Sequence, residues 1–169
     1  MKHALGLLDS LVGLVVALLF AAALILSLAG VAGRYLSSAL APDWGNEVVI
    51  YLVIWAVLLG AARVLRRSAH IRVDFLIDRL PKSAQTLAEI LSLILAFGLG
   101  AFLIWSGWQV VSEAMMWDER SISSLRMPLW IYYAALPASF ALQLIFLAER
   151  AADLLSGKSL SAPAHDLSD

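Results

Sequence analysis

The sequence contains no cysteine and few charged residues. Without cysteine, disulfide frameworks, thiolate metal sites, iron–sulfur clusters and cysteine nucleophiles are all excluded. Only 15% of the 169 residues are charged and 62% are apolar, which is far from the balance of a soluble domain. The net charge of -1 gives no reason to expect nucleic acid as a partner. The chain is therefore predicted to be an integral membrane protein.

Histidine is scarce too, and His3, His70 and His165 all lie outside the long apolar stretches. A four-helix haem protein needs paired histidines between its helices, so that class is excluded. The sequence also has no nucleophile elbow and no Gly-rich phosphate loop. We therefore predict no enzyme activity, no cofactor and no metal site.

Four stretches are long and apolar enough to cross a membrane, since a hydrocarbon core of roughly 30 Å needs about 20 such residues in a helix. They predict an all-α integral membrane fold with four transmembrane helices in one domain, residues 1–155, with spans at about 11–32, 47–66, 87–111 and 127–148. A cleaved signal peptide is the alternative for the first stretch. Its apolar run of roughly 20 residues exceeds the usual 7 to 15 or so and favours an uncleaved helix.

The segments outside the spans carry two further patterns. Val73, Leu76, Ile77 and Leu80 recur at helical spacing and predict a short cytoplasmic interfacial helix. Residues 156–169 are rich in Ser, Ala, Pro and Asp and lack apolar periodicity, which predicts a disordered tail.

Small residues recur at four-residue spacing in two of the spans. The first has Gly13, Ala17 and Ala21, and the third has Ala96 and Gly100. In lipid this spacing lets helix backbones approach closely, which predicts a packed bundle. Within the fourth span, Pro137 predicts a kink.

Basic residues are distributed unevenly between the two sides of the membrane. One side would hold nine of the twelve: Lys2, Arg63, Arg66, Arg67, Arg72, Arg79, Lys82, Arg150 and Lys158. The other side would hold Arg34, Arg120 and Arg126. Because basic residues next to the spans stay in the cytoplasm, we expect both termini to be cytoplasmic.

The apolar cores of the predicted spans lack ionisable residues, and Glu47, Glu89 and Glu113 lie at or near span ends. A small four-helix exporter that works alone is the main alternative function. It would need a carboxylate within the membrane to couple protons, because ionisable groups at that depth usually form ion pathways or substrate sites. The missing charge therefore favours a subunit that depends on a partner.

The second span and the loop after it contain an ordered set of residues: Glu47, Tyr51, Trp55, Leu59-Gly60-Ala61, Arg63 or Arg66, His70-Ile71-Arg72-Val73-Asp74 and Pro81. Other matches are Arg34-Tyr35, Ser124-Leu125, Pro128-Leu129-Trp130, Tyr133 and Pro137. In this order the residues resemble the small membrane subunit of TRAP (tripartite ATP-independent periplasmic) transporters, over roughly Arg34 to Pro137. Asn46 stands where a second acidic residue is common in that family, which weakens any role for a carboxylate pair there.

The resemblance implies a scaffold subunit of a sodium-coupled uptake system for an organic acid that carries a carboxylate, located in the inner membrane of bacteria. In that family a large multi-span permease subunit carries the sodium and substrate sites, a periplasmic solute-binding protein captures the solute, and the small subunit braces the large one. Contacts with a partner or with membrane lipids are then expected from Arg34, Glu47, Tyr51, Trp55, Arg63, Arg66, Arg67, His70 and Asp74. Snorkelling to headgroups, placement at helix dipoles and packing inside the bundle remain the alternatives for these residues.

Overall fold

The computed structural model describes residues 2–36, 43–67 and 82–155, and its regular structure is helical. The helices are α1 (Lys2–Leu36), α2 (Gly45–Arg67), α4 (Lys82–Met116), α5 (Leu129–Tyr133) and α6 (Ala135–Leu155). The stretches that could cross a membrane are Leu5–Tyr35, Gly45–Arg66, Ile90–Met116 and Leu129–Ala152. The predicted all-helical class with four candidate spans is confirmed. The predicted interfacial helix and tail fall outside the described residues.

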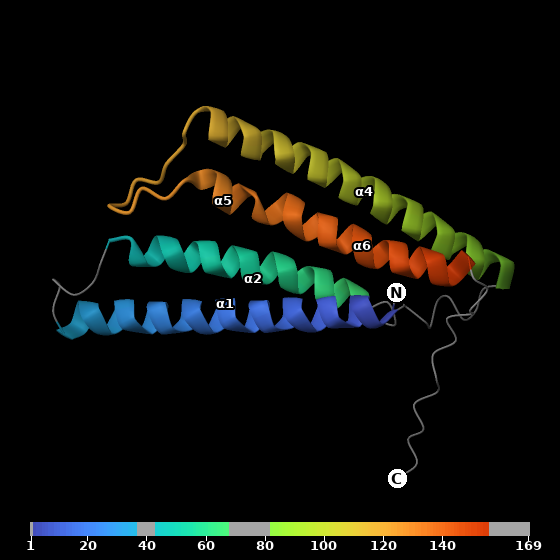
Figure 1. Ribbon diagram of the computed structural model, residues 1–169, viewed down its shortest axis with the longest axis horizontal. Helices are drawn as coiled ribbons and strands as arrows, with labels where there is room; N and C mark the ends of the chain where they lie inside the picture. The colour runs from blue at the N-terminus through green and yellow to red at the C-terminus, as the bar shows by residue number, and fades with distance from the viewer. Residues whose placement is uncertain (1, 37–42, 68–81, 156–169) are drawn as a thin grey trace, which may run out of the picture.

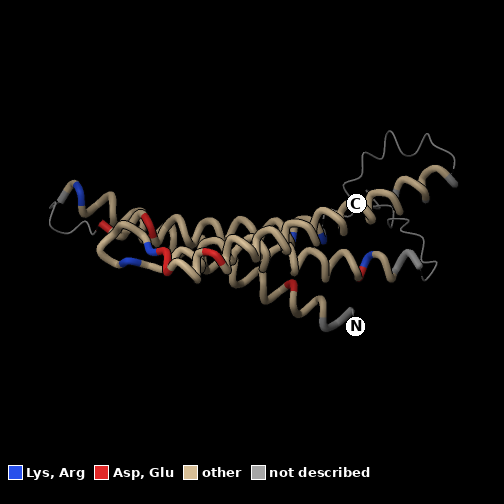
Figure 2. The backbone as a smooth tube through the Cα atoms, turned by 90° about the horizontal axis from the view of Figure 1, so that it is seen from above, with Lys and Arg blue, Asp and Glu red and all other residues tan. Residues whose placement is uncertain are grey.

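The four long helices lie side by side in a single layer instead of closing into a bundle. The extensive contacts join α1 to α2, α2 to α6 and α6 to α4, so that α1 and α4 form opposite edges (Figure 1). Viewed from above, the helices overlap along much of their length and spread apart toward the end that carries the N-terminus (Figure 2). The predicted bundle is therefore wrong in its arrangement.

Small residues allow close contact at some of the predicted positions only. A Cβ on Gly100 would lie 2.7 Å from the Leu144 side chain, so α4 and α6 pack closely at that point. On α1, Ala17 and Ala21 are exposed, and Gly13 is the member of the predicted set that faces a neighbour. The stripe predicted on α1 is thus wrong at its two alanines.

The fourth span is interrupted at Ala134, which separates α5 from α6. The interruption precedes Pro137, which is buried and cannot donate a backbone hydrogen bond to the carbonyl of Tyr133. The proline ring also crowds that carbonyl, so a regular helix cannot continue through this turn.

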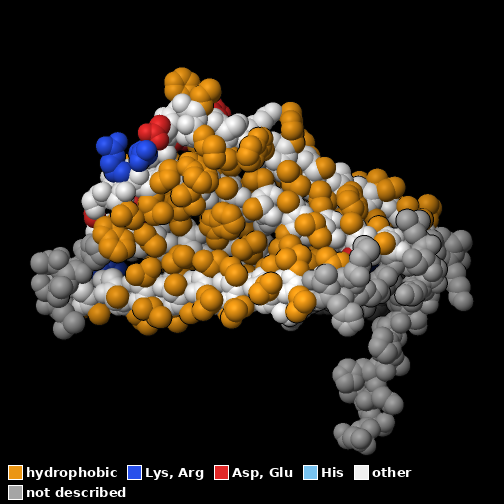
Figure 3. Space-filling view, viewed as in Figure 1, with side chains coloured by type: hydrophobic (Ala, Val, Ile, Leu, Met, Phe, Trp, Pro, Cys, Tyr) orange, Lys and Arg blue, Asp and Glu red, His pale blue; other side chains and the backbone are white. Residues whose placement is uncertain are grey.

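The surface of the layer is apolar between its two ends. Hydrophobic side chains cover most of the face shown in Figure 3, whereas Lys, Arg, Asp and Glu gather toward the ends of the helices (Figures 2 and 3). In α1 only 6% of the span is buried within the chain. Such a surface suits lipid tails or the apolar face of another membrane protein.

Candidate functional site

The end of the layer that carries the N-terminus contains four charged side chains, Asp9, Arg63, Arg66 and Glu149, which we call the charged cluster. Arg63 on α2 donates two hydrogen bonds to the Asp9 carboxylate on α1, from Nε at 3.0 Å and from Nη2 at 3.3 Å. The two side chains are 21% and 12% exposed. This ion pair therefore joins α1 to α2 in a mostly water-free setting.

Gly13 makes room for this ion pair. A Cβ at Gly13 would overlap the guanidinium group of Arg63, so the arginine lies across the bare backbone of α1 and reaches Asp9 one turn away. The residue type at position 13 is thus fixed by a side chain on the neighbouring helix.

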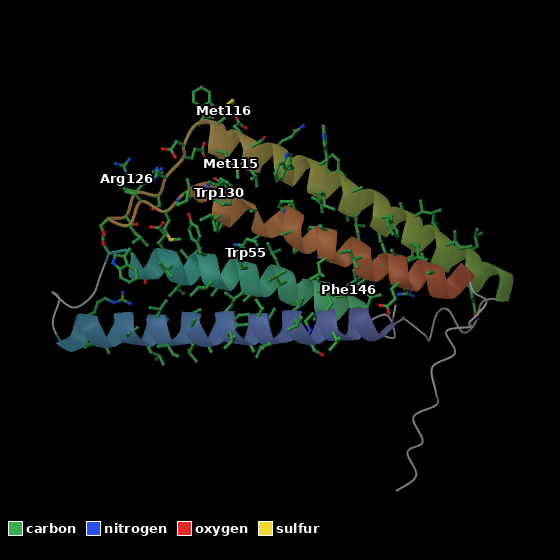
Figure 4. All side chains as sticks on the ribbon, in the orientation of Figure 1. Trp55, Met115, Met116, Arg126, Trp130 and Phe146 are labelled. Carbon is green, nitrogen blue, oxygen red and sulfur yellow. The ribbon has the colours of Figure 1, made fainter. Side chains whose placement is uncertain are left out.

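Arg66 joins three helices. Its Nε and Nη2 donate to the Glu149 carboxylate on α6 at 3.1 and 3.3 Å, and its Nη1 donates to the carbonyl of Leu5 on α1 at 2.8 Å. The guanidinium carbon also lies 5.0 Å from the ring centre of Phe146, a cation–π distance (Figure 4). Because Arg63 and Arg66 are three residues apart, they share one face of α2.

The sequence analysis identified both arginines but neither carboxylate. The predicted first span began near residue 11, which excluded Asp9, and Glu149 lay just beyond the fourth span. The sequence nevertheless contains a pattern that could have predicted both ion pairs: two arginines share one face of α2, and α1 and α6 each have an acidic residue near the same end. The structure uses both guanidinium groups within the chain, and their contact with lipid or a partner stays a prediction.

Trp55 connects the middle of α2 to the interruption in the fourth span. Its indole Nε1 donates to the carbonyl of Ile131 in α5 at 3.0 Å, and Figure 4 shows the ring between the two helices. Ile131 lies in an apolar span, where an unsatisfied carbonyl is costly, so the indole satisfies a group that the broken helix leaves available. The predicted partner contact of Trp55 is in this respect a contact inside the chain.

Glu47 and Tyr51 lie one turn apart on α2 toward the opposite end. The Tyr51 ring is 5.5 Å from that of Tyr132, which in turn is 5.5 Å from that of Tyr133. Glu47 Oε1 and the Tyr51 hydroxyl are buried and find no hydrogen-bond partner among the described residues. Arg34 does not join this group, because its Nε bonds to the carbonyl of Gly30 in its own helix.

Residues 117–128 between α4 and α5 fold back as a short hairpin. Backbone hydrogen bonds join Ser121 to Met127 and Leu129 to Glu119, both at 2.9 Å. Arg120 and Pro128 thereby face each other as an isolated antiparallel β-bridge. Arg120 also holds the Asp118 carboxylate at 3.0 Å, which lowers the pKa of Asp118 below its ordinary value. These bonds fix the shape of the hairpin.

The hairpin is tied to the start of α2 by Asp43. The Asp43 carboxylate accepts hydrogen bonds from the hydroxyl of Ser124 at 2.6 Å and from its backbone N–H at 3.0 Å. These two donors favour the charged carboxylate and lower the pKa of Asp43. The loops at this end of the layer therefore form one connected structure.

The remaining predicted residues are not placed. The backbone of Arg67 lies in α2 without a described side chain, and His70 and Asp74 fall outside the described residues. Within residues 2–36, 43–67 and 82–155, no group of three or more acidic or histidine side chains could hold a metal ion.

Comparison with known proteins connects this layer to a family. Residues 23–157 match the family described as the DctQ component of tripartite ATP-independent periplasmic transporters. The chain belongs to the DctQ family. Membership makes it a multi-pass membrane component of a transporter, namely the small permease subunit, and not an enzyme. The resemblance seen in the sequence is thereby confirmed.

Three relatives illustrate the range of this likeness. The C4-dicarboxylate TRAP transporter small permease protein of Rhodobacter capsulatus is 31% identical over 59% of this chain and 43% of its own length. The corresponding Vibrio cholerae protein is 25% identical over 89% of this chain and 73% of its own. The isethionate TRAP transporter permease protein DctMQ of Oleidesulfovibrio alaskensis is 29% identical over 67% of this chain, but the alignment covers only 18% of that protein.

The family match helps to separate the two ion pairs of the charged cluster. Arg66 and Glu149 both lie within the matched residues of this DctQ-family chain, whereas Asp9 and Gly13 precede them. The tie between α2 and α6 therefore lies within the matched residues. The tie to α1 involves residues outside the match.

Proposed function

We propose that this DctQ-family chain is a scaffold subunit of a sodium-coupled uptake transporter for an organic acid, and that it braces a large permease subunit. The supporting observation is the distribution of charge along the spans. No Asp, Glu, Lys, Arg or His occurs between residues 9 and 34, 47 and 63, 89 and 113, or 126 and 149. An organic anion crossing the bilayer needs polar partners at membrane depth, so its pathway is expected in another subunit.

The proposed partners are a large multi-span permease subunit and a periplasmic solute-binding protein. In the Oleidesulfovibrio relative, a stretch similar to this chain forms part of a much longer permease chain, which supports direct contact between the two components. A layer only one helix thick also leaves many large apolar side chains of α1, α2 and α4 exposed and available for lipid or for a large neighbour. The names of the relatives include C4-dicarboxylate and isethionate, which are both organic anions.

The proposed orientation places the charged cluster at the cytoplasmic side and the hairpin in the periplasm. It rests on the uneven distribution of basic residues. Because the chain has no cysteine, single cysteines at Ile122 and Leu87 can test it with an impermeant thiol reagent in intact cells. We expect labelling at position 122 and none at position 87 until the cells are opened, and the reverse pattern would overturn the orientation.

The function itself is tested by reconstitution. The chain alone, the large permease alone, and the two together are placed in liposomes with an inward sodium gradient, the solute-binding protein and a labelled C4-dicarboxylate. We expect uptake only when both membrane subunits, the binding protein and sodium are present. Omitting this chain should abolish uptake, because the large subunit is expected to need its brace.

The rival function, a small exporter that works alone, predicts a different result in the same experiment. Transport of the labelled acid by the purified chain without a permease subunit would refute the scaffold role and favour the exporter. Transport by the large permease at the full rate without this chain would refute the bracing role alone.

A further inference from the structure

The hairpin between α4 and α5 presents a group of side chains that the fold does not use. Ile122 is 105% exposed and Leu125 is 48% exposed, and both lie outside the candidate membrane spans. Next to them is Arg126, also exposed, and we call these three residues the hairpin tip. In Figure 4 the Arg126 side chain points away from the helix layer.

The tip is held in a fixed shape although Ile122 and Arg126 are exposed. The hairpin backbone bonds position it from the α4–α5 side, and the two hydrogen bonds from Ser124 to Asp43 position it from the start of α2. Arg126 has a φ of 46°, a left-handed conformation that non-glycine residues seldom adopt, and its N–H bonds to the carbonyl of Ser123 at 3.1 Å. A loop ordered in this way can bind with little further loss of conformational entropy.

The neighbours of the tip indicate an aqueous setting and not the hydrocarbon region. Ile122 lies between Ser121 and Ser123, and the Asp118–Arg120 ion pair in the same hairpin is largely exposed. Met116 and Trp117 lie at the end of the third candidate span and are exposed, which suits the headgroup level. In an aqueous setting the exposed Ile122 and Leu125 can be covered by a protein surface and not by lipid tails.

The charge of the tip itself is positive and indicates the chemistry of the surface that it would meet, although Glu113 and Glu119 also lie at this end of the layer. Asp43 is used by Ser124 and Asp118 by Arg120, whereas Arg126 forms no ion pair with any described carboxylate, although its charge helps to lower the pKa of Asp118. Arg34 is exposed at the same end of the layer and bonds only to its own helix. A complementary surface would offer an apolar recess bordered by carboxylates.

We propose that the hairpin tip is a docking surface for the soluble solute-binding protein, with Ile122 and Leu125 entering an apolar recess and Arg126 facing carboxylates at its edge. This inference rests on the proposed function and orientation, which place the tip in the periplasm. Ile122 is its anchor, because a fully exposed large side chain gains the most from being covered.

The test uses the complete complex of both membrane subunits in nanodiscs and measures its dissociation constant for the solute-binding protein. We expect Ile122→Ser to weaken binding by roughly ten- to a hundredfold, since burial of one large apolar side chain accounts for a factor of that order. Arg126→Glu should weaken binding about five- to tenfold, mainly by slowing association and more so at low salt. Met116→Ser is the matched control, because it removes another largely exposed apolar side chain, 74% exposed, from the end of α4 and should leave binding unchanged.

The outcomes separate this inference from the function on which it rests. If the wild-type complex takes up solute without the binding protein, both proposals are overturned. If wild-type uptake depends on the binding protein but Ile122→Ser and Arg126→Glu bind it as tightly as wild type, the docking surface alone is overturned. Two other results would also overturn the docking surface: Met116→Ser weakening the binding of the solute-binding protein as much as Ile122→Ser does, or Ile122→Ser reducing the amount of complex in the membrane. Either would show that these apolar residues hold the chain in the lipid.

Discussion

The ion pair between Arg66 and Glu149 gives the sharpest test of the charged cluster. Arg66→Met removes the guanidinium group while keeping an unbranched apolar side chain, and Glu149→Gln removes the charge while keeping an acceptor oxygen. Both partners are about four-fifths buried, with 21% and 17% of the side chains exposed, so the loss of one partner leaves a poorly solvated charge or donor.

The expected sizes follow from the contacts of each side chain. Breaking a buried ion pair by removing one partner costs about 3–5 kcal/mol, and the remaining exposure here reduces this to about 2–4 kcal/mol for Arg66→Met. That value includes the hydrogen bond to the Leu5 carbonyl, which contributes about 1 kcal/mol, and the contact with Phe146, which contributes a similar amount. Glu149→Gln should cost less, about 1–2 kcal/mol, because the amide oxygen still accepts a hydrogen bond. The double variant should be less destabilised than the sum of the two, with a coupling energy of about 1–3 kcal/mol.

The assay is equilibrium unfolding of the purified chain by SDS in mixed micelles, followed by tryptophan fluorescence. Arg120→Met is the matched control, because Arg120 also pairs with a carboxylate but in a largely exposed setting, and it should leave the midpoint unchanged. The reasoning is refuted if Arg66→Met and Glu149→Gln both behave like the control, or if their effects simply add. Either result would mean that the two groups are solvated separately at the membrane surface.

Three further predictions concern other contacts of the layer. Gly13→Ala should push the Arg63 guanidinium away from Asp9 and destabilise the chain by about as much as Asp9→Asn does, and the two effects should not add in the double variant. Gly30→Ala is the control, because a Cβ there meets nothing within 4 Å, and it should be neutral or slightly stabilising in the same SDS titration. Trp55→Phe should leave the Ile131 carbonyl without its donor and cost about 1–2 kcal/mol, and unchanged stability would exclude a role for this hydrogen bond. The Ser124 donors lower the pKa of Asp43, so the stabilisation from this contact should be complete above the ordinary carboxyl pKa and should fall as pH drops through the lowered value. Ser124→Ala should raise the pKa of Asp43 as measured by carboxyl-carbon NMR. An unaltered titration would contradict the contact.

The sequence was sufficient for the number of helices because each span is a long apolar run. It was not sufficient to predict which helices lie next to one another. A layer and a bundle need the same helix lengths, and Ala17 and Ala21 have the spacing of a contact stripe although they face outward. Hydropathy also placed the start of the first span near residue 11, whereas α1 continues without interruption from Lys2, which brings Asp9 inside the helix. Pairing with Arg63 is what makes a carboxylate acceptable at that position.

The same limit applies to the role of Trp55. A tryptophan in the middle of an apolar helix is recognisable from the sequence, but its partner is a backbone carbonyl that becomes available because the fourth span is interrupted near Pro137. The kink was predictable from the proline, and the hydrogen bond was not, because it depends on which face of α2 meets α5. Tertiary neighbours decide the function of a polar group in a span, and one sequence does not specify them.

A single layer places a special demand on polar contacts. Lipid tails are as apolar as leucine, so helices in a membrane gain little from hiding apolar surface against one another and depend on close packing and hydrogen bonds. In this layer the outer helices α1 and α4 pack extensively on one long neighbour each, α2 and α6 respectively, so less packing restrains them than in a closed bundle. The described ties lie at three depths: the charged cluster at one end, Trp55 in the middle, and Asp43 with Ser124 at the other. All of them involve α2 or Asp43, which lies just before it, so polar contacts hold α2 to its neighbours, while the exposed apolar side chains stay free to contact other molecules.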